Sequence, residues 1–481
     1  MTAAEVTSLT AAGLHEEYRA GTLSPREAAA AFLERIAEVD PELNAFCWID
    51  AEESSRQATE SERRYRAGRA LGPLDGVPVA VKDTLLTRGW PTLRGSRTVA
   101  RDQPWTEDAP SVRRLRANGA VLVGKTTTPE FGWKAVTDSP LTGVTRNPWA
   151  THLSPGGSSG GSAVAVASGM APLALGTDGG GSIRIPSSFC GTVGLKPTFG
   201  RVPQWPESPF AELSHLGPIA WTVADAATLL SVIADPDPLD VATERKPDPA
   251  APPGDGRRLR DVRIAFSPDL GYVELDDEIA AAAAAAAELL ESLGATVTYS
   301  DPGFDDPIDA FTVLWSLGLH RAIRHSSAEQ RSSMDPGMLE MAEAGARLAA
   351  EDRRAALEEQ ARLTTLVDGF FSGFDALVTP TLSIAGLPAG QEVPDGWPQR
   401  RWTSWTPFTY PFNLCGVPAA SVPCGFSSIG LPIGLQIIGP RHADGLVLSL
   451  ALAFEEAASL TDRRPVLAQA RGRSARQADS P

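Results

Sequence analysis

Residues 154–194 read SPGGSSGGSAVAVASGMAPLALGTDGGGSIRIPSSFCGTVG. Two glycine–serine clusters, GGSSGGS and GTDGGGS, are joined here by a segment of small and mostly apolar residues. Glycine is costly to order on folding, so this density indicates places where the backbone must approach a ligand or a developing charge. The succession Gly179, Gly180, Gly181 and Ser182 offers adjacent backbone N–H donors, as an oxyanion hole requires. A flexible loop without a role is the alternative, but the cluster runs directly into the apolar-flanked Ser-Ile-Arg-Ile-Pro, which favours a catalytic loop.

A lysine upstream of these clusters is a candidate base. Lys82 follows the apolar run 76–81 (GVPVAV), which is typical of a buried strand, and precedes Asp83. A lysine can accept a proton only when burial lowers its pKa enough to keep the amine neutral. From the local sequence alone, a surface lysine at the end of a strand is the alternative.

A P-loop pattern occurs at residues 119–126 (GAVLVGKT). That motif needs a flexible loop after a strand, whose backbone N–H groups surround phosphate. Here the four intervening residues are apolar and β-forming, and the preceding residues 111–118 have a helical pattern. We therefore expect a strand and not a nucleotide site.

A nucleophile-elbow pattern, G-x-S-x-G, occurs at residues 156–160. The elbow needs a strand before the serine, and an acid and a histidine downstream. The preceding RNPWATHLSP is a poor strand, and His320, His325 and His442 lie in segments without active-site features. We therefore do not expect a Ser-His-Asp triad.

Strand and helix patterns alternate along the chain, which indicates an α/β or mixed α+β layered fold. A helix is predicted to begin at Ser24-Pro25 with a capping box to Glu27, and to run through Ile36. A second, alanine-rich helix is predicted between Asp276 or Asp277 and Leu293-Gly294. The expected strands are 77–81, 120–124, 262–266, 295–299, 376–380 and 434–439.

Three ordered motifs resemble those of the amidase signature family: GVPVAVKD (76–83), GGSSGGSA (156–163) and GTDGGGSIRIP (176–186). The resemblance continues through 119–132, 194–203, 213–227 and 412–440, so it covers most of the chain. It implies an α/β fold of one large domain, in which a twisted mixed β-sheet is flanked on both sides by α-helices. We expect this domain over 1–467, with an N-terminal helical segment at about 5–65, a Pro-rich surface loop at about 235–261, and a disordered tail at 468–481.

The resemblance also implies a mechanism of amide hydrolysis. Neutral Lys82 would deprotonate Ser158, which would deprotonate Ser182 as Ser182 attacks the amide carbonyl and becomes an acyl-enzyme. Backbone N–H groups from Gly179 to Ser182 would bind the oxyanion. The resemblance places a cis peptide at Gly157–Ser158 and implies supporting roles for Ser159, Asp178 and Arg184. It implies no metal and no organic cofactor.

Two other functions are weighed against a stand-alone amidase. One is the glutamine-hydrolysing A subunit of a tRNA-dependent amidotransferase, which supplies ammonia to partner subunits. Residues 204–218 (QWPESPFAELSHLGP) argue against it, because those subunits usually carry a tyrosine and a Ser-Ser-Leu-Asp segment there. The other is an inactive member of the family that acts as a binding module. The presence of Lys82, Ser158 and Ser182 argues against it.

The substrate is predicted only by class. Four tryptophans, Trp133, Trp205, Trp402 and Trp405, are candidates to line an apolar pocket for aryl or alkyl amides, although buried tryptophans more often fill cores. The resemblance suggests a homodimer.

The composition is that of a soluble globular protein, with 481 residues and a formal net charge of -16. This acidity opposes binding to nucleic acid, and no apolar stretch reaches membrane-spanning length, so neither is an expected partner. The N-terminus does not have the pattern of a signal peptide, which predicts a cytoplasmic protein. The four scattered cysteines, Cys47, Cys190, Cys415 and Cys424, are expected to be reduced and mostly buried thiols.

Overall fold

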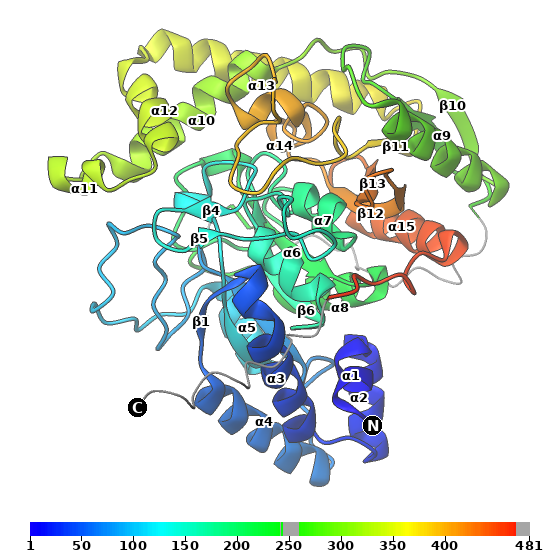
Figure 1. Ribbon diagram of the computed structural model, residues 1–481. Coiled ribbons are helices and arrows are strands. Elements are labelled where there is room, and N and C mark those ends of the chain that lie inside the picture. Colours follow the sequence, from blue (N-terminus) through cyan, green and yellow to red (C-terminus); the bar gives the residue numbers. More distant parts are fainter. Residues whose placement is uncertain (241, 244–258, 468–481) are drawn as a thin grey trace, which may run out of the picture.

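An eleven-stranded mixed sheet runs through the protein in the order β1-β3-β2-β6-β8-β7-β12-β13-β11-β9-β10 (Figure 1). The computed structural model describes residues 1–240, 242–243 and 259–467. The strands of the large sheet are β1 (Phe46–Ile49), β2 (Pro78–Lys82), β3 (Val121–Thr126), β6 (Leu173–Asp178), β7 (Val193–Lys196), β8 (His215–Ala220), β9 (Arg263–Phe266), β10 (Thr296–Tyr299), β11 (Ala376–Pro380), β12 (Ala419–Phe426) and β13 (Pro432–Ile438). A separate hairpin pairs β4 (Asp138–Ser139) with β5 (Gly143–Val144).

Helices lie on both sides of the sheet, which confirms the predicted fold class. They are α1 (Ala3–Ser8), α2 (Ala11–Ala20), α3 (Pro25–Leu43), α4 (Ala51–Arg66), α5 (Pro110–Ala117), α6 (Gly160–Ala167), α7 (Arg184–Cys190), α8 (Val223–Ile233), α9 (Asp277–Ser292), α10 (Ile308–Ile323), α11 (Ala328–Ser332), α12 (Pro336–Arg347), α13 (Ala350–Phe370), α14 (Pro411–Leu414) and α15 (Asp444–Ala458). Short 3-10 helices are η1 (Glu130–Gly132), η2 (Ala211–Leu213) and η3 (Trp402–Trp405).

Alternating side chains on β2 show how the two faces of the sheet are covered. Successive residues of a strand point to opposite faces. Val79 and Val81 pack in the apolar cluster that includes residues of α5, α8, α9 and α15. Ala80 packs on the other face with α6, whose eight residues are all buried. The helix α6 is therefore enclosed within the molecule, and the first glycine–serine cluster leads into its first turn.

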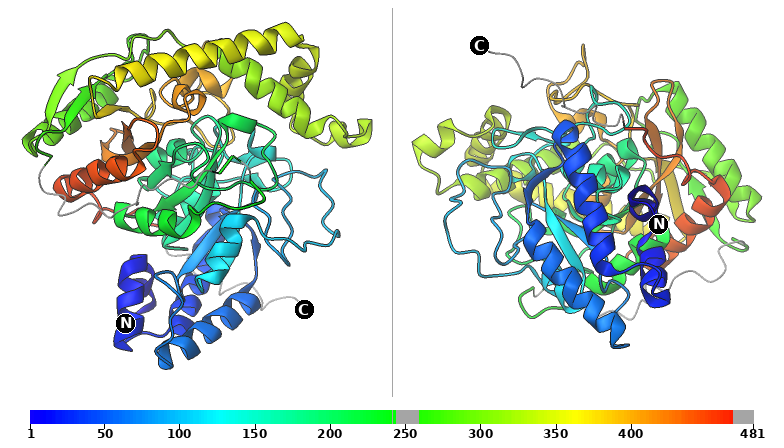
Figure 2. Two further views of the ribbon diagram at one scale, coloured as in Figure 1. Left: turned by 180° about the vertical axis from the view of Figure 1, so that it is seen from behind. Right: turned by 60° about the horizontal axis from the view of Figure 1, so that its bottom comes forward.

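Two groups of helices form the ends of the molecule. The first four helices lie at one end, and α10, α12 and α13 lie at the other (Figure 1). Figure 2 shows, from behind, α13 spanning the end that is farthest from α1–α4. The elements next to the glycine-rich segments, α6, β6 and α7, lie between these ends (Figure 1).

Local signals placed several elements correctly. The capping box of Ser24 and Glu27 starts α3 at Pro25, but the helix continues past Ile36 to Leu43. Asp276 is the N-cap of α9, and Gly294 follows it with a φ of 105°. All six predicted strands are present within a few residues of their predicted bounds.

The expected segments outside this frame are described in part. Residues 3–66 are helical except for β1 and short connections. Between α8 and β9, the described residues of the Pro-rich segment form no helix or strand. Residues 241 and 244–258 of that segment, and the predicted tail 468–481, lie outside the described residues. In the described part of the chain, no helix has the length and apolar character to cross a membrane.

Candidate active site

Two neighbouring parallel strands bring the second glycine cluster to the predicted base. Strand β2 pairs in parallel with β6, with Val81 opposite Leu175. The carboxyl ends of the two strands therefore lie at the same edge of the sheet. Lys82 is the last residue of β2, and Thr177 is the penultimate residue of β6. The two strand ends are therefore neighbours, and Lys82 Nζ lies within hydrogen-bond distance of Thr177 Oγ1.

Lys82 is surrounded by hydroxyl groups. Its Nζ lies 2.8 Å from Ser158 Oγ, 2.8 Å from Ser159 Oγ and 2.9 Å from Thr177 Oγ1. The Ser159 O–H donates to the Thr177 carbonyl at 3.0 Å, so Ser159 accepts from Lys82. Since a neutral amine has two N–H donors and one lone pair, donation to Ser159 and Thr177 leaves the lone pair for Ser158.

Burial determines the protonation of this lysine. Lys82 is fully buried. Burial lowers the pKa of Lys82 from 10.5 to about 7, although the negative charge of Asp178 acts in the opposite direction. A substantial fraction of the amine is therefore neutral at neutral pH, as a base requires.

The first glycine–serine cluster reaches Lys82 from the start of α6. The peptide bond Gly157–Ser158 is cis, as predicted. Ser159 occupies the N-cap position of α6, where a serine usually accepts from a helix N–H group. Its side chain makes no such bond, and instead bonds with Lys82 and Thr177. The hydroxyl is therefore used to orient the lysine and not to cap the helix.

A buried ion pair holds the second glycine cluster. Arg184 donates to Asp178 through Nε and Nη2, both at 3.0 Å, and neither side chain is exposed. Burial opposes the ionisation of Asp178, but the Arg184 guanidinium holds the pKa of that carboxyl well below its usual range. Arg184 also donates to Asn413 Oδ1, Gln436 Oε1 and the Thr409 carbonyl. The pair therefore links the loop to the C-terminal part of the sheet.

The carboxylate of Asp178 in turn shapes the loop that carries Ser182. It accepts from the Gly181 N–H at 2.7 Å and from the Ile183 N–H at 3.1 Å. Gly181 has a φ of 125°, and a Cβ there would lie 2.4 Å from Thr409 Oγ1, so only glycine fits. Among the described residues, the N–H groups of Gly179, Gly180 and Ser182 have no acceptor.

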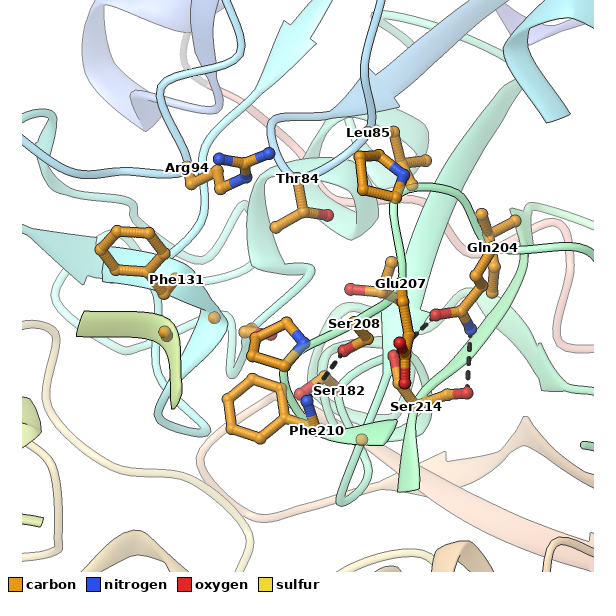
Figure 3. Close-up of a pocket in the computed structure, with 18 of the residues that line it drawn as sticks. Thr84, Leu85, Arg94, Phe131, Ser182, Gln204, Glu207, Ser208, Phe210 and Ser214 are labelled. Carbon is orange, nitrogen blue, oxygen red and sulfur yellow. Dashed lines mark hydrogen bonds between the residues drawn. The ribbon is translucent and has the colours of Figure 1, made fainter. Parts of the chain in front are cut away.

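The loop opens on a cavity of about 360 Å³. Ser158 and Ser182 both line it, and the Ser182 hydroxyl makes no hydrogen bond within the described part of the chain. Figure 3 shows Ser182 beside Phe210 at one side of the cavity, and Arg94 and Thr84 at the other. The apolar part of the wall consists of Leu85, Ala109, Phe131, Trp205, Pro206, Pro209, Phe210, Leu216, Trp315 and Ala322.

The tryptophans are divided between wall and core. Of the four candidates, Trp205 lines the cavity, whereas Trp133, Trp402 and Trp405 are buried in the cluster with α10 and α12. Trp315 was not among the predicted residues, yet it lines the cavity and stacks on Phe210 with ring centroids 3.9 Å apart.

Thr177 was also not predicted, although it lies inside the GTDGGGS motif. No local signal in the sequence indicated its contact with Lys82, because that contact depends on how β2 and β6 pair. The P-loop-like segment is strand β3, as expected, and its Lys125 forms a buried ion pair with Asp83 at 3.2 Å. Within the described residues, no cluster of His, Cys, Asp or Glu could hold a metal ion.

The chain matches known proteins over nearly its whole length. The model of the family described as Amidase matches residues 27–448. An acylamidase from Rhodococcus erythropolis is 37% identical over 465 residues, covering 95% of this chain and 97% of that protein. The A subunit of the glutamyl-tRNA(Gln) amidotransferase of Synechococcus sp. (strain CC9605) is also 37% identical, covering 95% of this chain and 98% of that protein.

A solved structure agrees with the sequence matches. The crystal structure of a bacterial aryl acylamidase of the amidase signature family superposes with a TM-score of 0.87 at 30% identity. The match covers 95% of this chain and 99% of that one.

Proposed function

The chain belongs to the amidase signature family and is an amidohydrolase that acts on C–N bonds, and from this premise we propose that it hydrolyses amides on its own through a Ser182 acyl-enzyme. The observation that supports the proposal best is the contact of a buried lysine with Ser158. Because Ser159 and Thr177 take the two N–H donors of the neutral amine, its lone pair is directed at the Ser158 hydroxyl.

Acylation begins with two proton transfers. Ser158 gives its proton to Lys82 Nζ and takes the proton of Ser182, while Ser182 Oγ forms a bond to the amide carbonyl carbon. The carbonyl oxygen becomes an oxyanion, which accepts from backbone N–H groups of the glycine loop. Gly179, Gly180 and Ser182 have N–H groups free for this purpose, whereas Gly181 already donates to Asp178.

The tetrahedral intermediate then collapses. The C–N bond breaks, and the leaving nitrogen takes a proton from Ser158, which recovers one from Lys82. The acyl group stays on Ser182 as an ester. Water attacks this ester through the same relay, so the carboxylate leaves and all three residues regain their starting protonation. Asp178 and Arg184 act as positioning residues, because they hold the loop and not the substrate.

The cavity wall supports an amide with an apolar body as substrate. Aromatic and aliphatic side chains from loops, β8 and α10 line the same cavity as Ser182. Phe210 and Trp315 stack as one platform, which suits an aryl or alkyl group.

The glutamine-hydrolysing subunit of an amidotransferase is the second candidate, because a relative with that name is as similar as the acylamidase. Residues 204–210, which form part of the wall of the cavity, belong to the segment that lacks the tyrosine and Ser-Ser-Leu-Asp pattern expected of those subunits. We therefore favour the stand-alone enzyme.

A labelling experiment and a substrate panel test both parts. A fluorophosphonate should label Ser182, and Ser182→Ala should abolish labelling and turnover. Ser208→Ala is the matched control, because Ser208 lies in the same wall and its loss should leave labelling intact. The purified chain should release ammonia or amine from benzamide, long-chain amides and anilides. Failure to label Ser182 contradicts the nucleophile, and turnover of glutamine alone contradicts the stand-alone amidase.

A further inference from the structure

Arg94 lies in the loop that connects β2 to α5 and lines the cavity of the candidate site. Its φ is 55°, a left-handed conformation that residues other than glycine seldom adopt. The Arg94 N–H donates to the Asp83 carbonyl at 3.1 Å, and the Arg94 carbonyl accepts from the Phe131 N–H at 2.7 Å. Both backbone groups of Arg94 are thus hydrogen-bonded, and this fixes the position of its Cα atom.

A neighbouring residue repeats this arrangement. Phe131 also has a positive φ, of 52°, and also lines the cavity. Uncommon backbone conformations persist where the surrounding structure holds them, and they cluster at ligand sites. The hydrogen bond between the two residues therefore presents one cationic and one aromatic side chain to the same space.

The guanidinium of Arg94 has no partner. Within the described residues it makes no hydrogen bond and no ion pair. Asp83 acts on it through its charge, but the Asp83 carboxylate is paired with Lys125 at 3.2 Å. Burial lowers the pKa of Arg94, with Asp83 acting in the opposite direction. A largely dehydrated cation without a partner is unfavourable, and an anionic ligand would relieve that cost.

The other charged groups of the cavity do not satisfy Arg94. Glu207 and Arg321 line it too, but both are exposed, and neither forms an ion pair in the described part of the chain. Figure 3 shows Arg94 and Ser182 at opposite sides of the cavity. A ligand that reached both would have its reacting group at Ser182 and its anionic group at Arg94.

We propose that Arg94 binds a carboxylate of the substrate, so that the preferred amide has an apolar body with a carboxylate remote from the scissile bond. A guanidinium binds a carboxylate through two parallel N–H bonds, which fixes direction as well as charge. Arg94 thereby determines specificity, and Ser182 performs the reaction. The inference rests on the function proposed above for the same cavity.

Binding to Ser182→Ala tests the inference without requiring turnover. Two matched pairs serve as probes: terephthalamate against para-nitrobenzamide, and glutaramate against isoheptanamide. Each pair differs in a terminal carboxylate and has a similar shape. By titration calorimetry, at least one carboxylate should bind about tenfold tighter or more than its neutral partner, as a charged hydrogen-bonded pair provides.

Variants assign that preference to one residue. Arg94→Asn removes the cation and keeps a residue type that tolerates a left-handed backbone, and it should abolish the preference. Arg94→Lys keeps the charge and should retain part of it. Arg97→Asn is the control, because it removes the same charge from the same loop. Arg97 is exposed and does not line the cavity. Thermal unfolding confirms that each variant is folded.

The outcomes separate the two proposals. Equal binding of both members of each pair, or a preference that survives Arg94→Asn, overturns the inference, while labelling of Ser182 can still support the amidase mechanism. If the binding preference depends on Arg94 but Ser182 is not labelled by the fluorophosphonate, the inference is supported and the proposed mechanism is contradicted. In the active enzyme, the ratio of kcat/KM within a pair should fall about tenfold in Arg94→Asn.

Discussion

Lys82→Met should abolish activity and change the stability of the protein in a pH-dependent way. The pKa of Lys82 is lowered from 10.5 to about 7 by burial in the folded protein. Between these values the unfolded chain binds a proton that the folded protein does not, so the stability of the wild type rises with pH through this window. Below about pH 7 the folded protein buries a charged amine, and this lowers the free energy of unfolding by about 5 kcal/mol.

Methionine removes this cost together with three hydrogen bonds. The contacts of Lys82 with Ser158, Ser159 and Thr177 are lost, at about 1 kcal/mol each. The variant should therefore be about 2 kcal/mol more stable than the wild type near pH 6 and about 3 kcal/mol less stable near pH 10.5. The difference between the two proteins should change sign as the pH rises.

Urea unfolding at a series of pH values from 6 to 10.5 measures this difference. Other titrating groups contribute equally to both proteins, so subtraction isolates Lys82. Ser158→Ala is the control, since it removes one of the same hydrogen bonds and leaves the amine, and its difference from the wild type should vary much less with pH. A constant difference between Lys82→Met and the wild type would mean that the buried amine is charged, and the lysine base would be refuted.

Three further outcomes are expected. For a neutral amide, kcat/KM should rise with pH along one limb with a midpoint near 7, because only neutral Lys82 accepts a proton; a profile that falls across that range contradicts this. Ser159→Ala should lower kcat about a hundredfold with little change in KM, because Lys82 loses an acceptor that is anchored to Thr177. Steady-state kinetics that showed a higher KM with unchanged kcat would contradict this. Gly181→Ala should lower stability by about 1–3 kcal/mol and stop labelling of Ser182, because its Cβ would lie 2.4 Å from the Thr409 hydroxyl; thermal unfolding and labelling like those of the wild type would contradict it.

The strands that the sequence predicted are short runs rich in apolar and β-branched residues. The prediction for 376–380 coincides with β11. Strand β8, with the sequence HLGPIA, was missed because its glycine and proline read as a break. Its pairing with β6 overrides that local preference, and such long-range pairing leaves no signal in a short window of sequence.

Part of the candidate site could be predicted from the sequence, because its chemistry demands unusual residues there. Runs of glycine and serine are rare enough to identify the segment of Ser158 and Ser182, and the cis peptide at Ser158 followed from the resemblance. The positions of Thr177 and Arg94 could not be predicted in this way. The position of the Thr177 side chain depends on how two strands pair. The position of the Arg94 side chain depends on a left-handed backbone, which a single arginine in the sequence does not predict.

The long reach of Arg184 has a consequence for the order of events during synthesis. Its guanidinium bonds with Asp178 close by, but also with Asn413 and Gln436, which are translated more than two hundred residues later. A ribosome therefore exposes both serines and the lysine long before the groups that anchor their loop have been made. In the mechanism proposed above, the reacting groups of the nascent chain stay unassembled until α14 and β13 emerge, so activity should appear only late in translation.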